Sequence, residues 1–406
     1  MKDLRSIWLP ARPSRFITNI TNVAPAIGLL LALIHSAFAQ PWTQTSAPVT
    51  NWSSVASSAD GIKLVAAVRD GPIYISTNSG ATWEQTSAPV TNWSSVASSA
   101  DGTKLAAVGY SGVFTSADSG ANWTAISGVS GRRIACSADG TKLLVAGNGL
   151  YRSTNFGATW TPLSGGGNWV IASSADGTKL VSAYFNHNGF PMGCICISTN
   201  SGATWTQTSA PLFSWTGWTA LASSADGTKL AATIGYTSFP TGPGPIYVSP
   251  DGGGTWQASG SPTSHWTSVA CSADGVRLVA TMTFGGIYTS TDSGATWVSN
   301  DVPVASWSAV ACSADGTKLV AVVDGGGIWI SQSIPAPLLT LRASGGVGVL
   351  AWTVPSMNFI LQQNADLSAP NWTEVTNAGS LNLTNLQYEV GVSSLQSGNC
   401  FFRLRH

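Results

Sequence analysis

Charged residues are scarce in this sequence. Only 9% of the 406 residues are Asp, Glu, Lys or Arg, and 18 basic residues balance 18 acidic ones. Nucleic acids and anionic membranes are bound through clustered positive charge, which a chain of zero net charge with so few basic residues does not supply. The composition therefore excludes nucleic acid as a partner and favours a neutral ligand or a protein.

The groups that most often carry catalysis or bind metals are also few. The four histidines, His35, His187, His265 and His406, lie far apart and show no metal-ligand spacing. No Asp-Gly turn carries the clustered oxygen ligands that calcium needs. There is no Gly-x-Ser-x-Gly elbow and no phosphate-binding loop. We therefore expect no metal and no cofactor.

The sequence lacks an apolar run long enough to span a membrane. Val23 to Phe38 has 16 residues, interrupted by Pro25 and Gly28, whereas a spanning helix needs about 20. Basic residues precede this stretch and Ala37-Phe38-Ala39 ends it, which is the order of an export signal with its cleavage site. We expect residues 1–39 to be removed, leaving no integral membrane segment, and the mature protein to lie in the envelope of a bacterium or outside the cell. A retained anchor is the alternative.

Glycine and tryptophan are abundant instead, with 44 and 18 copies, and many of them belong to one repeated stretch. Ser76 to Trp83 has the pattern Ser-x-Asx-x-Gly-x-Thr-Trp, here called the box, and it recurs at intervals of about forty residues. The other copies are Ser116 to Trp123, Ser153 to Trp160, Ser198 to Trp205, Ser249 to Trp256 and Ser290 to Trp297. We expect the Asx side chain to accept a hydrogen bond from a backbone N–H two residues on, and the glycine to supply a positive φ. The box thus predicts a self-capped hairpin, which its tryptophan locks onto a sheet.

A second marker, Ser-Ala-Asp-Gly, divides the chain into seven units. Its aspartates are Asp60, Asp101, Asp139, Asp176, Asp226, Asp274 and Asp315. Each unit predicts four strands, exemplified by strand A (Trp93 to Ala97), strand B (Lys104 to Val108), strand C (Gly112 to Thr115) and a strand D after the box. Four short strands in each unit of about forty residues indicate a propeller blade.

The two ends of the repeat complement each other. Strand C of the seventh unit, Gly327 to Ser331, has no box after it, while Trp42 to Thr45 resembles a strand D without its preceding strands. We therefore expect the N-terminal strand to complete blade seven and to cover two sheet edges. The fold class is all-β: a seven-bladed propeller of four-stranded blades, closed by an N-terminal outer strand and followed by a small sandwich.

With these motifs, residues 40–333 resemble the Asp-box (bacterial neuraminidase repeat) propellers. This resemblance implies the fold, but its families include sialidases, xyloglucan-cleaving hydrolases, sortilin-like receptors and photosystem II assembly factors, so it does not choose between enzyme and binder. After a predicted linker, residues 334–337, the segment 338–406 alternates in short apolar runs. Through Leu361-Gln362-Gln363, Asn371-Trp372-Thr373 and Phe402-Arg403-Leu404 it resembles a fibronectin-III or immunoglobulin-like module, which implies a role in spacing or attachment.

Six cysteines in an exported chain suggest disulfides, but their positions do not. Cys136, Cys271 and Cys312 occupy a register filled by serine in other units, so we expect small buried residues. Cys194 and Cys196 lie two apart on one face of a predicted strand, which is poor geometry for bridging each other.

The candidate binding residues lie in three long insertions of blades four and five. The connections B to C and D to A are expected on the face opposite the box hairpins, and they are longest in these two blades. Exposed aromatics on such loops can stack on a sugar or a peptide, although the same side chains could form a lid that packs on itself. The insertions carry Tyr184, Phe185, His187, Phe190, Phe213, Trp215, Tyr236 and Phe239.

Two further sets of residues can be interpreted as binding or as structure. Trp52, Trp93, Trp218, Trp266 and Trp307 share one register at the start of strand A, with Trp169 one place off. They could be aromatic platforms near the axis, but the favoured interpretation is that they fill gaps between blades. Arg132 and Arg133 could hold a ligand carboxylate, or they could be solvated or cap backbone carbonyls.

The propeller has few side chains that could carry out catalysis. A sialidase-type site needs three convergent arginines and a tyrosine activated by glutamate, whereas the propeller's only glutamate is Glu84, directly after a box. A glycosidase needs two carboxylates, and the one candidate pair is Asp70 and Asp324, in the B to C loops of blades one and seven. We therefore expect a monomeric, non-enzymatic propeller that binds a glycan or a protein at blades four and five, with a glycoside hydrolase as the alternative.

Overall fold

A computed structural model provides the structure of the protein. It describes residues 41–164, 170–183, 193–212, 217–235 and 243–332 and, nearer the C-terminus, residues 340–344, 347–353, 360–364, 373–376, 380–382, 387–392 and 401–405. Every regular element in these residues is a β-strand, and they belong to two compact units, of which the larger ends at Ser333. Each unit is described by itself.

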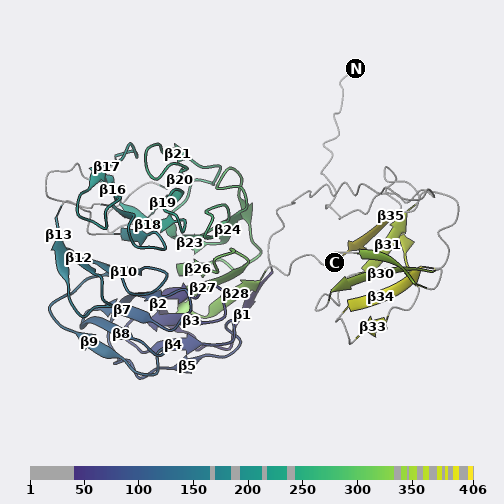
Figure 1. Cartoon of the computed structure of the whole chain (residues 1–406), viewed down its shortest axis with the longest axis horizontal. Coiled ribbons are helices and arrows are strands. Elements are labelled where there is room, and N and C mark those ends of the chain that lie inside the picture. Colours follow the sequence, from purple (N-terminus) through teal and green to yellow (C-terminus); the bar gives the residue numbers. More distant parts are fainter. Residues whose placement is uncertain are drawn as a thin grey trace, which may run out of the picture. The chain divides into compact units, whose positions relative to one another are not determined.

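The larger unit consists of seven antiparallel blades arranged as a propeller (Figure 1); blades two to five are separate four-stranded sheets, whereas the pairings β23–β26 and β27–β2 join blades six, seven and one into one sheet. Within a blade, strands A to D follow one another outward from the axis, as the repeat predicts. Blade one comprises β2 (Thr50–Ser57), β3 (Leu64–Val68), β4 (Ile73–Ser76) and β5 (Glu84–Gln85); blade two, β6 (Trp93–Ser98), β7 (Leu105–Gly109), β8 (Gly112–Ser116) and β9 (Thr124–Ile126); blade three, β10 (Arg133–Cys136), β11 (Leu143–Ala146), β12 (Leu150–Ser153) and β13 (Thr161–Leu163); blade four, β14 (Val170–Ser173), β15 (Leu180–Ala183), β16 (Ile195–Ser198) and β17 (Thr206–Gln207). Blade five comprises β18 (Trp218–Ser223), β19 (Leu230–Ile234), β20 (Ile246–Ser249) and β21 (Gln257–Ala258); blade six, β22 (Trp266–Cys271), β23 (Leu278–Gly285), β24 (Ile287–Ser290) and β25 (Val298–Ser299); blade seven, β26 (Ala305–Cys312), β27 (Lys318–Gly326), β28 (Ile328–Gln332) and β1 (Trp42–Gln44).

The N-terminal strand is the outer strand of blade seven. β1 pairs antiparallel with β28, and Trp42, Thr43 and Gln44 lie opposite Ser331, Ile330 and Trp329. This is the predicted pairing. Trp42 is buried, and it packs in the cluster that contains Trp307 and Val279, between blades six and seven. The first strand of the propeller therefore contributes to the core of its last two blades.

The box forms the expected hairpin with one difference. In blade one the N–H of Thr82 donates to Oδ1 of Asn78 (2.9 Å), so the side chain bonds four residues on and not two. The reason is that Ser79 and Gly80 both have positive φ (58° and 87°), which turns the chain so that the later N–H faces the amide. The Ser76 hydroxyl also accepts from the N–H of Gly80 (2.9 Å), and these two bonds cap the hairpin locally.

The seven Ser-Ala-Asp-Gly turns are joined by a series of backbone hydrogen bonds. The alanine N–H of each turn donates to the alanine carbonyl of the next blade's turn at 2.6–2.8 Å, and the last bond returns from Ala314 to Ala59. The residues are Ala59, Ala100, Ala138, Ala175, Ala225, Ala273 and Ala314. Within each turn the serine hydroxyl donates to the aspartate, as Ser58 does to Asp60 (2.6 Å). The repeated marker is therefore explained by contacts between blades.

The strand-A tryptophans fill the spaces between blades, as favoured from the sequence. Trp52, Trp93, Trp218, Trp266 and Trp307 are each at most 1% exposed. Trp52, for example, packs edge-on against Tyr74 of its own blade and beside Val322 of blade seven. Their full burial excludes them as aromatic platforms for a ligand; Trp169 lies outside the described residues.

The smaller unit contains two antiparallel sheets. The first has the order β29 (Thr340–Ser344), β30 (Val347–Thr353), β34 (Gln387–Val392) and β33 (Ser380–Asn382), and the second β32 (Thr373–Glu374), β31 (Ile360–Asn364) and β35 (Phe401–Arg405). Leu350, Leu361 and Val390 are buried. The smaller unit is therefore all-β, and the packing of its two sheets as a sandwich stays a prediction.

Candidate functional site

The connections between strands separate onto two faces of the propeller. In six blades the box hairpin bonds to the A to B turn of its own blade, as from the N–H of Ser79 to the carbonyl of Ile62 (2.8 Å). We call this side the turn face. We call the other side the loop face. There the B to C connection of a blade pairs with the D to A connection that leads from this blade into the next, as between Gly71 and Thr91. The sequence predicted this division of the two faces correctly.

Exposed large apolar side chains gather on the loop face. Seven such side chains occur among the described residues, and six of them lie on the loop face, five in B to C or D to A connections and one near the end of β23. The six are Val49, Val90, Tyr110, Leu212, Phe284 and Val304, whereas Ile62 lies on the turn face. An exposed apolar surface is a candidate for contact with a partner.

Four of these six side chains occupy equivalent places in the repeat. Val49, Val90, Leu212 and Val304 each follow a proline in a D to A connection, and the residue before that proline is buried or half-buried. One side chain thus anchors the loop while the residue after the proline projects into solvent. This set of residues was not predicted, although the repeated Pro-Val and Pro-Leu pairs were a visible signal in the sequence.

Phe284 is the most unusual residue of the loop face. It has a φ of 51°, in the left-handed region that bulky side chains avoid, and it is 79% exposed. It is the extra residue of a β-bulge, because Thr283 pairs with Ser306 and Gly285 with Ala305. The equivalent bulge residue of blade seven is Gly325, whose φ is 76°. Blade six therefore has a bulky aromatic where blade seven uses a glycine, and it directs that aromatic into solvent.

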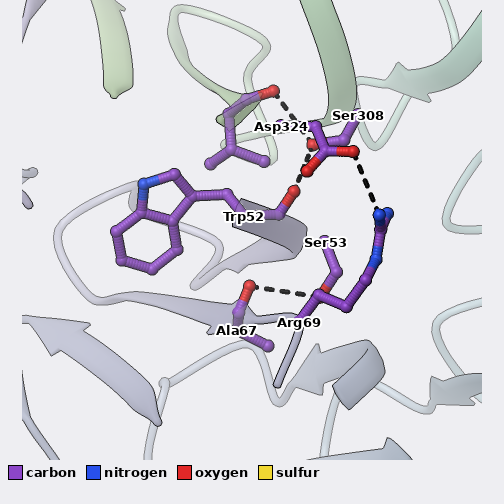
Figure 2. Close-up of polar contacts among 7 residues, drawn as sticks. Trp52, Ser53, Ala67, Arg69, Ser308 and Asp324 are labelled. Carbon is purple, nitrogen blue, oxygen red and sulfur yellow. Dashed lines mark hydrogen bonds and ion pairs between the residues drawn. The ribbon is translucent and has the colours of Figure 1, made fainter. Parts of the chain in front are cut away.

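The two candidate acids lie at the junction of blades one and seven. Arg69 reaches from blade one and forms an ion pair with Asp324 of β27 (3.1 Å), as Figure 2 shows. Asp70 follows Arg69 in an exposed turn with a φ of 56°. In the same view the Ser308 hydroxyl of blade seven donates to the carbonyl of Trp52 (2.7 Å). Asp324 thus lies near the end of β27, where it pairs with Asn51 of β2, and not in a B to C loop as predicted; its carboxylate is bonded to Arg69, the neighbour of Asp70.

Arg132 and Arg133 stand at the start of the innermost strand of blade three. The Arg133 guanidinium donates to the carbonyl of Arg132 (3.2 Å), which is the carbonyl-capping arrangement. Both side chains are exposed, and partial desolvation by the surrounding protein, with the charge of Arg132, lowers the pKa of Arg133. A bound carboxylate would stabilise the positive charges of the two guanidinium groups, so Arg132 and Arg133 stay candidate contacts for a ligand carboxylate.

The predicted aromatic residues of blades four and five lie outside the described residues. They are Tyr184, Phe185, His187, Phe190, Phe213, Trp215, Tyr236 and Phe239. The strands that flank their loops are in place, with β15 ending at Ala183 and β19 at Ile234. The binding role of these residues stays a prediction.

The five cysteines in the described part of the chain are free thiols. Cys194 and Cys196 are fully buried, whereas Cys136, Cys271 and Cys312 are partly exposed and not buried as expected, because the innermost strands face the axis of the propeller. Neighbouring strands still desolvate the thiols of Cys136 and Cys271, and this desolvation raises the pKa of each to about 12. Among the described residues no three His, Cys, Asp or Glu side chains come together to hold a metal, and no helix has the length and apolarity to cross a membrane.

Comparison with solved structures supports the fold. A GH74 enzyme from Niastella koreensis superposes with a TM-score of 0.54 at 19% identity over 71% of this chain and 44% of its own. A GH74 xyloglucanase from Xanthomonas campestris gives 0.57 at 16% over 77% and 59%, and YCF48 bound to D1 peptide gives 0.53 at 14% over 73% and 98%.

These comparisons establish a class and not a particular protein. The chain has the β-propeller fold, which it shares with hydrolases and with a peptide-binding protein. It spans less than half of the Niastella koreensis enzyme. No protein-family model matches the chain, and no curated protein matches its sequence.

Proposed function

We propose that the protein is an exported binding propeller of the Asp-box type that recognises a protein partner through its loop face. The observation that carries this proposal is the strained, exposed Phe284. It costs stability where a glycine would not, by about 1–3 kcal/mol. A bulky side chain in such a backbone is explained by contact with a partner.

The chemistry of the loop face favours a protein over a glycan. Sugars stack on aromatic rings, but only Tyr110 and Phe284 among the six exposed apolar side chains are aromatic. The other four, Val49, Val90, Leu212 and Val304, are aliphatic, and aliphatic side chains pack against apolar side chains. Phe284 and Val304 belong to neighbouring loops of blades six and seven, because Gly285 pairs with Ala305. The aromatic insertions of blades four and five extend this surface in the proposal, and the smaller unit serves as spacer or attachment module.

A peptide-array screen of the full chain tests the proposal. We expect binding to extended peptides with apolar residues, weakened about tenfold or more by Phe284→Gly and by Val304→Ser, as when a central apolar contact of an interface is removed. Ile62→Ser is the matched control, since Ile62 is exposed on the turn face, and it should bind like the unchanged chain. Peptide binding that is equal in all four proteins would refute the proposed surface.

A glycoside hydrolase is the second candidate. It is favoured by the junction of blades one and seven, where Asp324 of β27 is paired with Arg69, the residue next to Asp70, and by the GH74 hydrolases among the structures of similar fold. Incubation with xyloglucan, followed by mass spectrometry of the products, tests it. Cleavage that disappears in both Asp70→Asn and Asp324→Asn would replace the binding proposal, whereas no cleavage, or cleavage that survives either change, removes this candidate.

A further inference from the structure

A cavity of about 330 Å³ lies between blades five and six, on the turn face. It is bounded on one side by the start of β19, the end of β20 and the outer strand β21, and on the other by the box hairpin of blade six. The equivalent junctions of blades one and two and of blades seven and one hold cavities of only about 10 Å³, which is room for about one water molecule. One junction of the repeat is thus open where two others, here called the closed junctions, are filled.

Two small side chains of blade five line this cavity. Val248 stands directly before the box serine, where blades one and seven have isoleucine, and Ser259 follows β21, where they have threonine. The larger residues are Ile75 with Thr86 in blade one and Ile330 with Thr45 in blade seven. In blade one the threonine methyl packs close to the box of blade two, since a Cβ on Gly120 would lie 3.3 Å from the Thr86 methyl. Blade five has one carbon atom fewer at each of the two places, which contributes to the open space.

The cavity carries one positive and one negative side chain that do not pair with each other. Lys229 and Asp292 both line it, and the one ion pair among the described residues joins Arg69 to Asp324. In blades two, three and four the equivalent lysine donates to the carbonyl of the aspartate in the next turn, at 2.6–2.8 Å. Lys229 instead contacts the box hydroxyl of Ser293 (3.5 Å), as the lysines of the closed junctions do with theirs. Because an ammonium group has three donors, this long contact leaves Lys229 able to bind a ligand.

The remaining lining offers an acceptor and an apolar wall. The Asp292 carboxylate accepts from the hydroxyl of Ser290 (2.7 Å) and from the N–H and the hydroxyl of Thr296 (2.9 and 2.6 Å). A carboxylate can accept about four hydrogen bonds, so one place is left for a ligand. Leu230 and Leu278 add apolar side chains to the wall of the cavity.

We infer that this cavity binds a small apolar α-amino acid such as leucine. Its carboxylate contacts the ammonium group of Lys229 and the hydroxyl of Ser293, its ammonium group contacts Asp292, and its side chain packs against the apolar wall. A ligand of one charge would leave one of the two protein charges without a partner in the cavity, and an uncharged apolar ligand would leave both. The cavity lies at the lower end of the range of ligand pockets, about 300–1,000 Å³, which suits a small molecule.

Isothermal titration calorimetry of the full chain with L-leucine tests the site. We expect one leucine to bind per chain. Leucinamide lacks the carboxylate and isocaproic acid lacks the ammonium group, and each should bind about tenfold or more weakly than leucine, because each loses a hydrogen bond to a charged group.

Variants drawn from the other blades locate the binding. The double change Val248→Ile and Ser259→Thr restores the residues of the closed junctions, so the chain should fold, which circular dichroism checks, and leucine should bind at least about tenfold more weakly. Lys229→Met should remove the preference for leucine over leucinamide, whereas Lys63→Met, at the closed junction of blades one and two, should bind like the unchanged chain. Asp292→Asn introduces the residue that three other boxes carry at this place, and it should remove the preference for leucine over isocaproic acid.

Three results would overturn the inference. They are the absence of leucine binding to the unchanged chain, binding of leucinamide or isocaproic acid as tight as that of leucine, and leucine binding that Lys229→Met weakens no more than Lys63→Met does. None of these results depends on the peptide or glycan bound by the loop face, because the cavity lies on the turn face.

Discussion

The pairing of β1 with β28 predicts that the first residues of the propeller stabilise its last blades. Trp42 is 8% exposed and packs among residues of blades six and seven. A buried tryptophan removes about 150–250 Å² from water, and replacing it by alanine in a core costs about 3–5 kcal/mol. Trp42→Ala should therefore lower the free energy of unfolding by about that amount.

The neighbouring residue provides the control. Thr43 lies on the same strand but is exposed, so Thr43→Ala should change stability by no more than about 0.5 kcal/mol. A chain that begins at Asn51 also loses the three paired residues of β1, and it should be less stable than the single variant. It also leaves β28 as an uncovered edge, which promotes aggregation.

Scanning calorimetry of the transition of the larger unit measures the effect. At about 2–4 °C per kcal/mol for domains of 150–250 residues, the melting temperature of Trp42→Ala should fall by roughly 10 °C. If Trp42→Ala and the chain from Asn51 both melt within about 1 °C of the unchanged protein, β1 does not contribute to the core and the reasoning is refuted.

Two further predictions concern the turn face. Hydrogen bonds from serine and threonine hydroxyls and a backbone N–H lower the pKa of Asp139 and Asp176 from 3.8 to about 2. Because the folded-state pKa is the lower one, these bonds stabilise the protein above about pH 4 and are lost as the pH falls toward 2. The melting temperature should therefore fall between pH 4 and pH 2, and it should fall less steeply when Asp139 and Asp176 are both changed to Asn. An equal fall in the melting temperature of the two proteins would contradict this prediction. In urea unfolding, Gly102→Ala should lower the free energy of unfolding more than Gly128→Ala. Both glycines have positive φ, but only a Cβ at position 102 would meet the Lys63 side chain, at 2.7 Å. Equal losses would show that the Lys63 side chain moves aside without cost.

The fold could be predicted from the sequence because the chain repeats itself. Seven copies of one turn and six boxes give strand order, blade number and the division of the two faces, and the extra strand at Trp42 matches the missing strand after Ser331. The tryptophans were correctly expected to fill space, since their spacing follows the blades. The box hydrogen bond was misplaced because it depends on two consecutive positive φ values, of which only the glycine was evident.

The loop-face surface was not predicted, for a physical reason. Whether Val304 is buried or exposed depends on how its loop pairs with the preceding blade, and this pairing contains a bulge that composition does not reveal. The bulge in turn decides that Phe284, and not a glycine, has the left-handed backbone. Residue types alone pointed to aromatics on long loops, whereas this surface also consists of short aliphatic side chains after prolines.

A comparison of the seven blades distinguishes residues that the fold requires from residues that it does not require. Each copy of Ser-Ala-Asp-Gly is accounted for by the hydrogen bonds between turns, so its recurrence is no evidence of a ligand on the turn face. Phe284 in place of a glycine, and Val248 with Ser259 in place of an Ile and a Thr, have no such explanation in the fold. Because the other blades fold without these residues, selection for structure does not account for them. In this propeller the departures from the repeat, more than the repeat itself, indicate where function lies.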